Sequence, residues 1–143
     1  MQVEVVTPAG IAASAECDEV TAPGVRGEFG VLPGHTPFIT ALKPGVLVWK
    51  SKSGSGEKKG GVLAIGSGFA EISGKDKIVV LTQHAATLEQ IDPTAAQKDL
   101  DEAERLLKEW KTPEAGAAGP SREDLEARRA WAQARLDARN TKA

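Results

Sequence analysis

The spacing of hydrophobic positions divides the chain into two parts. Up to about residue 86, apolar runs of four to six residues alternate with turns that contain glycine or proline. Many short runs at this spacing are typical of an antiparallel β-sandwich or barrel, and not of alternating βα units. We therefore predict an N-terminal antiparallel β-sandwich over residues 1–86, with strands in the segments VEVV (3–6), GVLVW (45–49), GVLAIG (61–66), FAEI (69–72) and KIVVL (77–81).

A polar, glycine-rich stretch, SKSGSGEKKGG at residues 51–61, separates two of these runs. We expect it to form a solvated hairpin loop between two strands. Part of it, GSGEKKGG, is similar to a phosphate-binding loop but lacks the spacing G-x-x-x-x-G-K-[ST]. Residues 51–61 therefore do not predict a nucleotide-binding site.

Helical spacing replaces the strand pattern over residues 87–143. Asp92 and Pro93 have the residue types of an N-cap and a first helical position. Residues 112–120, TPEAGAAGP, end this first helix. Its apolar stripe follows at spacings of four, three, four and three residues: Ala96, Leu100, Ala103, Leu107 and Trp110.

A second helix is predicted to begin at a capping-box-like pair, Ser121 and Asp124, and to run to about Asn140. With the first helix it forms an antiparallel hairpin. Alanine dominates one face and buries little area, so we expect weak packing and a helix that can change partners. A small solvated hairpin with an imperfect pattern is the alternative. The two faces are Ala127, Ala130, Trp131, Ala134 and Ala138 on one side, and Leu125, Ala132 and Leu136 on the other.

Composition excludes several classes of function. The 143 residues carry a net charge of −2, which argues against a nucleic-acid binder that works by bulk charge. The single cysteine, Cys17, allows no internal disulfide, and the N-terminus lacks the features of a signal peptide. No apolar stretch approaches the roughly 18 residues of a membrane span. We expect a soluble protein that meets a membrane only through a partner.

Catalytic side chains are scarce. The two histidines, His35 and His84, belong to no cluster with metal-ligand spacing, and no G-x-S-x-G is present. We therefore predict neither a catalytic residue nor a metal ligand. The segment GEFGVLPGHTPFITALKPG, residues 27–45, is interpreted instead as a contact surface. Its glycines and prolines would fix a loop that exposes Phe29, His35 and Phe38, although some of these side chains could fold back into the sandwich.

Two motifs carry a family resemblance. GEFGVLPGHTPFITALKPGVL, residues 27–47, closely resembles the signature of the epsilon subunit of bacterial F-type ATP synthases, roughly G-E-x-G-x-x-P-G-H-x-P-x-x-x-x-x-x-P-G. GFAEISGKDKIVVLTQHA, residues 68–85, is similar to the last strands of that family. The chain length and the order of sandwich and helices also agree.

The resemblance implies a rotor subunit without catalytic activity, on the cytoplasmic face of the bacterial plasma membrane as a peripheral protein. Its sandwich would bind the gamma subunit on one side and the ring of c subunits at one end. It would thus couple proton or sodium flow to ATP synthesis. Matched by motif position, the c-ring contacts are Glu28, Phe29 and Gly30, and the gamma contacts are Thr7, His35 and Thr40.

The resemblance also implies that the helices regulate the reverse reaction. The hairpin would open so that its second helix reaches the alpha/beta catalytic head and blocks ATP hydrolysis. From residue 121 onward, six basic side chains outnumber four acidic ones, which suits an acidic surface. The arginines expected to act there are Arg122, Arg128, Arg129, Arg135 and Arg139.

Some members of that family bind ATP through a segment resembling I/L-D-x-x-R-A. The matching stretch is IDPTAA, residues 91–96, in which Ala95 replaces the arginine. Without that guanidinium, and with Asp92 committed to N-capping, we expect weak ATP binding or none, and no other cofactor. Two other functions remain open from the residues alone: a β-sandwich adaptor for unrelated partners, or a small enzyme with its site at 27–45.

Overall fold

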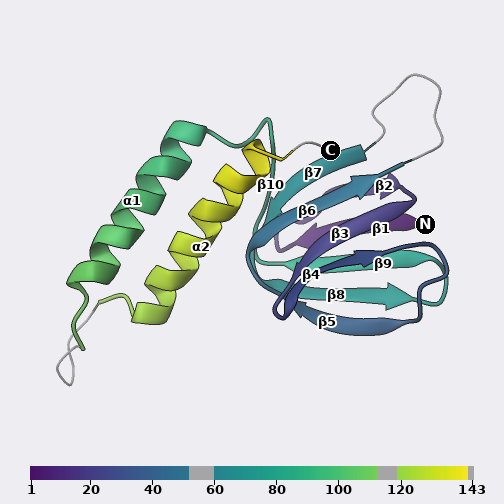
Figure 1. Ribbon diagram of the computed structural model, residues 1–143, viewed down its shortest axis with the longest axis horizontal. Helices are drawn as coiled ribbons and strands as arrows, with labels where there is room; N and C mark the ends of the chain where they lie inside the picture. The colour runs from purple at the N-terminus through teal and green to yellow at the C-terminus, as the bar shows by residue number, and fades with distance from the viewer. Residues whose placement is uncertain (52–59, 113–118, 142–143) are drawn as a thin grey trace.

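The computed structural model describes residues 1–51, 60–112 and 119–141. In these residues ten strands precede two helices. Figure 1 shows this arrangement, so the predicted order of a β part and a helical hairpin is confirmed. The strands are β1 Gln2–Thr7, β2 Gly10–Glu16, β3 Glu19–Gly24, β4 Gly27–Val31, β5 Phe38–Leu42, β6 Gly45–Lys50, β7 Gly60–Ile65, β8 Gly68–Ser73, β9 Lys77–Thr82 and β10 Ala85–Thr87. The helices are α1 Pro93–Glu109 and α2 Arg122–Arg139.

The sandwich is one continuous hydrogen-bonded sheet that folds over on itself. Its strand order is β10-β7-β6-β3-β5-β8-β9-β1-β2, and β4 adds to β3. The pairs are antiparallel, as predicted, except that β1 runs parallel to β9. Strand β10 reaches Thr87, one residue beyond the predicted domain boundary at 86.

Strand β3 joins the two layers because it has three partners. Its first residues pair with β6, its whole length from Val20 pairs with β4, and Gly24 pairs with Leu42 of β5. At this corner a side chain on Gly24 would place a Cβ 2.8 Å from the carbonyl oxygen of Gly27. Glycine is therefore required there by close backbone approach.

The main core lies between the two layers and contains no helical residue. It is built almost entirely from aliphatic side chains, which agrees with the low aromatic content of 4%. Its fully buried members include Val3, Val5, Val20, Val31, Leu47, Leu63, Ile65, Ala70, Ile78 and Val80. The sandwich is therefore packed without help from the helices.

Both helices start as the sequence predicts. The carboxylate of Asp92 accepts hydrogen bonds from the backbone N–H groups of Thr94, at 2.9 Å, and Ala95, at 3.3 Å. Ser121 and Asp124 form a complete capping box. These caps satisfy N–H groups that have no partner within a helix. The strands on either side of the loop predicted at residues 51–61 are confirmed, but Gly60 and Gly61 belong to β7, where they pair with Lys50 and Trp49, and residues 52–59 lie outside the described residues.

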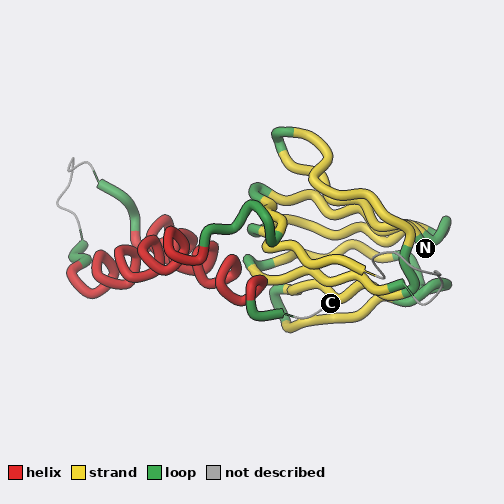
Figure 2. The backbone as a smooth tube through the Cα atoms, turned by 90° about the horizontal axis from the view of Figure 1, so that it is seen from above, coloured by secondary structure: helices red, strands yellow, loops and turns green. Residues whose placement is uncertain are grey.

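The helical hairpin projects from one end of the sandwich (Figure 2), with α2 between α1 and the sheet (Figure 1). Trp131 and Ala138 pack against Val62 and Ala64 of β7 in a second apolar cluster. Leu125 lies on the opposite side of α2, toward α1, and only 1% of its surface is exposed. Both apolar faces of α2 therefore contain buried residues in the same conformation, Ala138 on one face and Leu125 and Ala132 on the other, while Ala127 is exposed.

Candidate docking surfaces

The P-G-H part of the signature folds into a tight turn. The N–H of His35 donates a hydrogen bond to the carbonyl oxygen of Leu32 at 3.2 Å, and Gly34 has a φ of 82°. Proline in the second position and a residue with positive φ in the third are the requirements of a type II turn. The motif therefore encodes one backbone conformation, and His35 closes it.

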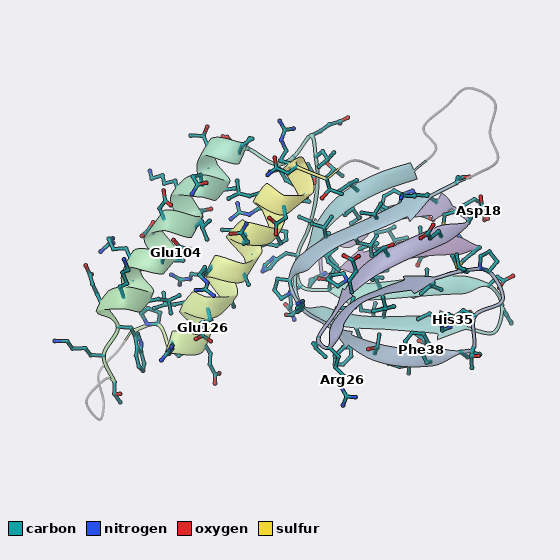
Figure 3. All side chains as sticks on the ribbon, viewed as in Figure 1. Asp18, Arg26, His35, Phe38, Glu104 and Glu126 are labelled. Carbon is teal, nitrogen blue, oxygen red and sulfur yellow. The ribbon has the colours of Figure 1, made fainter. Side chains whose placement is uncertain are left out.

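His35 is exposed at the end of this turn (Figure 3). Its ring centroid lies 5.1 Å from that of Phe38, and its Nδ1 lies 2.8 Å from the carbonyl oxygen of Thr36. The backbone N–H of Gly34 donates to a carboxylate oxygen of Asp76, in the turn between β8 and β9, at 2.8 Å. Contacts to β5 and to the β8–β9 turn therefore hold the histidine in place.

The two phenylalanines of the motif are not fully exposed, unlike His35. Phe29 and Phe38 are half-buried, pack against the main core and meet edge to face, with ring centroids 5.8 Å apart. The expectation that residues 27–45 expose Phe29, His35 and Phe38 is thus right for the histidine and wrong for the phenylalanines. The reason is that this segment contains two strands, β4 and β5, whose alternate side chains point inward.

The residues predicted to meet the c ring lie on β4. Glu28 and Gly30 are exposed, while the side chain of Phe29 between them points into the sandwich. Glu28 adjoins the β3–β4 turn, where Val25 is 54% exposed and Arg26 is also at the surface. Figure 3 shows Arg26 and His35 near opposite ends of the sandwich. The β3–β4 turn beside Glu28 and the turn at His35 therefore lie apart, whereas Phe29 is linked to His35 through the ring of Phe38.

The three predicted gamma contacts are dispersed. The hydroxyl of Thr7 donates to the carbonyl oxygen of Gly10 at 3.3 Å and accepts from the N–H of Ala9 at 3.2 Å, so it closes the β1–β2 hairpin. Thr40 is half-buried on β5, in register with the buried Ala70. The strand register places Thr7 at the end of the strands near Gly68 and Thr82, and the turn of His35 at the other end, beside Asp76. The structure thus brings these residues to one layer of the sandwich but not into one cluster.

The sheet also carries an exposed apolar surface that the sequence pattern does not predict. Cross-strand pairing aligns Ala41, Phe69, Leu81, Val6 and Ile11 in one row across β5, β8, β9, β1 and β2, here named the apolar strip. Phe69 is 57%, Leu81 53% and Ile11 66% exposed. In the sequence, Phe69 and Leu81 are two apolar residues in two separate predicted strands, and nothing indicates that they are neighbours. Only the strand register places them side by side.

On the helical side, a set of four side chains links α2 to both of its neighbours. The ring of Trp131 lies against that of His84, with centroids 5.3 Å apart, and the guanidinium carbon of Arg135 lies 5.4 Å from the Trp131 ring. Arg135 also forms an ion pair with Asp99 of α1, at 3.0 Å. We name His84, Trp131, Arg135 and Asp99 the Trp131 clasp.

The other arginines of α2 differ in their surroundings. Arg122 pairs with Glu126 one turn along the helix, at 3.1 Å, and Arg139 donates to the carbonyl oxygen of Leu88 at 3.5 Å. Arg128 and Arg129 are exposed and form no ion pair with any described residue. Arg128 lines a groove of about 290 Å³ between the two helices, together with Trp131 and Arg135.

The described residues form no cluster of side chains suited to metal binding or redox chemistry. Among residues 1–51, 60–112 and 119–141, no three His, Cys, Asp or Glu side chains could together hold a metal ion. Cys17 is buried, and this burial raises the pKa of its thiol, which keeps it protonated and unreactive. At the position of the ATP motif, the Asp92 carboxylate is occupied by the helix cap, as described above.

No helix in the described part of the chain is long and apolar enough to cross a membrane.

Comparison with known proteins gives a consistent result. Residues 1–88 match the family model of the "ATP synthase, Delta/Epsilon chain, beta-sandwich domain". The ATP synthase epsilon chain of Geotalea uraniireducens is 44% identical over 108 residues, which cover 76% of this chain and 74% of that one. The ATP synthase epsilon chain of Desulfosudis oleivorans is also 44% identical, over 75% of this chain and 77% of its own length.

The fold is also shared with solved structures. A chain of the mitochondrial ATP synthase of Euglena gracilis superposes with a TM-score of 0.73, over 97% of this chain and 80% of that one, at 24% identity. A chain from the central stalk and c-ring structure of the Tetrahymena thermophila enzyme gives 0.59 at 12% identity, over 97% of this chain and 96% of that one. On the family model and the curated relatives together, this chain belongs to the family of ATP synthase epsilon chains.

Proposed function

We propose that this chain is a rotor subunit in the central stalk of an ATP synthase, where it joins the c ring to the gamma subunit. As an epsilon chain it is a non-catalytic subunit of that enzyme, which excludes the alternatives of an unrelated adaptor and of a small enzyme. Residues 1–86 are the binding part and residues 87–143 the regulatory part. The chain is held at the cytoplasmic side of the plasma membrane through the c ring.

The apolar strip is the observation that supports a docking role best. Three large side chains, Phe69, Leu81 and Ile11, are each more than half exposed and lie in one row. Covering such a side chain contributes about 1–2 kcal/mol. The row lies on paired strands, so little conformational entropy is lost when a partner covers it. We assign this strip to the gamma subunit, with Thr7 at one end and His35 beyond the other. Thr40 adjoins Ala41 of the strip, but its side chain is on the core side of the sheet, like that of its partner Ala70.

Replacing Leu81 by Ser should weaken binding of gamma by about tenfold, since it removes one apolar side chain from the middle of the strip. Isothermal titration of the purified chain with gamma measures this change. Val25→Ser is the matched control, because Val25 is as exposed as Leu81 but lies at the β3–β4 turn. Equal weakening by both substitutions, or by neither, would contradict the assignment of the strip.

Charge reversal at Glu28 should weaken binding to the c ring and not to gamma. Glu28→Lys is expected to lower retention of the chain on c-ring-containing membranes, whereas His35→Ala should lower affinity for gamma. Both side chains are exposed, so neither change should move the melting temperature by more than about 2 °C. Sedimentation with membranes and titration with gamma separate the two effects. A large fall in melting temperature with normal assembly would show that these residues serve the fold instead.

The helices are proposed to regulate ATP hydrolysis. In the closed hairpin α2 packs on β6 and β7, and the Trp131 clasp holds it there. Release of α2 would free it to reach the alpha/beta catalytic head. Arg128 and Arg129 are then its most available cations, since they form no ion pair with the described residues of the closed state.

A further inference from the structure

We propose that Asp76 is a positioning residue, which holds the turn at residues 32–35 in the conformation that presents His35 to the gamma subunit. The inference rests on the proposed function, because it assumes that gamma docks at His35. It concerns a residue outside the signature motif, in the turn between β8 and β9.

Within the turn itself, the backbone N–H of Gly34 has no hydrogen-bond acceptor. The hydrogen bond that closes it runs from the N–H of His35 to the carbonyl oxygen of Leu32. The N–H of Gly34 takes no part in that bond and points out of the turn. Asp76, 42 residues away in the sequence, accepts this N–H at 2.8 Å. A short hydrogen bond to a carboxylate is stronger than one to a neutral acceptor.

Asp76 can hold the turn because its own backbone is fixed. Its carbonyl oxygen accepts the N–H of Gln2 at 2.9 Å, so the β8–β9 turn is tied to β1. Its φ is 52°, in the left-handed region that Asn and Asp adopt more readily than most residues. Gly74, two residues before Asp76, lies close to Pro37, because a Cβ there would be 3.6 Å from the proline ring. The β8–β9 turn therefore approaches the chain both before and after His35 in the sequence, at Gly34 and at Pro37.

Three substitutions separate the possible roles of Asp76. Asp76→Gly removes the acceptor and tolerates the positive φ, whereas Asp76→Asn keeps an acceptor oxygen and also tolerates it. Lys75→Gly adds the same flexibility to the same turn without removing an acceptor. The full-length variants are compared by amide hydrogen exchange at Gly34, measured by NMR, by titration with the gamma subunit, and by melting temperature.

Asp76→Gly is expected to speed exchange at Gly34 and to weaken gamma binding by about three- to tenfold, Asp76→Asn, which keeps a neutral acceptor, should lose less than Asp76→Gly, and Lys75→Gly should stay within about twofold of the unchanged chain. Exchange that is unchanged in Asp76→Gly would overturn the proposal. So would equal losses in all three variants, or faster exchange with full affinity for gamma. His35→Ala reports on the proposed function separately. If it binds gamma normally, the docking assignment of His35 fails, and so does the role of Asp76 in presenting it, whatever the exchange rates show.

Discussion

Deletion of residues 121–143 should raise ATP hydrolysis by the assembled ATP synthase, while ATP synthesis changes little. The deletion removes α2, which is proposed to block hydrolysis when it leaves the sheet. If half of the complexes are blocked at a given moment, removing the block gives about a twofold increase. ATP hydrolysis and ATP synthesis are measured on the same membrane preparation.

The deletion should leave the sandwich intact. Its main core contains no residue beyond Val80, so the packing between the two layers does not depend on α2. What the deletion uncovers is the second cluster, including Val62 and Ala64 of β7. Because this exposed cluster could impair assembly, an immunoblot must show that the complexes contain the truncated subunit. Unchanged hydrolysis in such complexes would leave the helices with a structural role alone.

The closed structure gives the arginines of α2 different surroundings, so their substitutions are expected to affect ATP hydrolysis differently. The sequence favours the view that all five serve the contact with the catalytic head. In the closed hairpin, however, Arg135 already pairs with Asp99 and stacks on Trp131, and Arg139 donates to the backbone of Leu88. Neutralising these two weakens the closed state as well as any contact with the head. Arg128 has no ion pair among the described residues, so its substitution tests the head contact more directly.

Local features of this fold could be read from the sequence because local physics determines them. Asp92 and Ser121 cap helices through hydrogen bonds to residues two or three positions away. The turn at Pro33 and Gly34 follows from the backbone preferences of these two residues. The apolar spacing of residues 96–103 predicts the buried stripe of α1, which the structure confirms for Ala96, Leu100 and Ala103.

Features that depend on which strands become neighbours could not be predicted. Periodicity shows that Phe69 and Leu81 occupy alternate strand positions, but not that they face each other across β8 and β9. The parallel pairing of β1 with β9 and the three partners of β3 are likewise set by topology. The two apolar faces of α2 were recognised, yet the pattern cannot tell whether they are covered together or in turn.

Replacing Trp131 by Ala should have the opposite effect to the deletion and lower ATP hydrolysis. Trp131 joins α2 to β7 through the second apolar cluster, to His84 by ring contact, and to Arg135 by a cation–π contact. Truncation of this half-buried ring should cost the closed hairpin about 1–3 kcal/mol. The ratio of released to closed α2 then rises by roughly five- to 150-fold, and more complexes are blocked.

Trp110→Ala is the matched control, because Trp110 lies at the end of α1 and donates from its ring to the carbonyl oxygen of Pro120, away from the sheet. Hydrogen exchange of α2 in the isolated chain should become faster in Trp131→Ala than in Trp110→Ala. Asp99→Asn provides the independent test, because it removes the α1 partner of Arg135 and leaves α2 unchanged, and it should lower hydrolysis in the same direction. If Trp131→Ala instead raises hydrolysis, the ring belongs to the contact with the catalytic head, and the clasp does not govern release of α2.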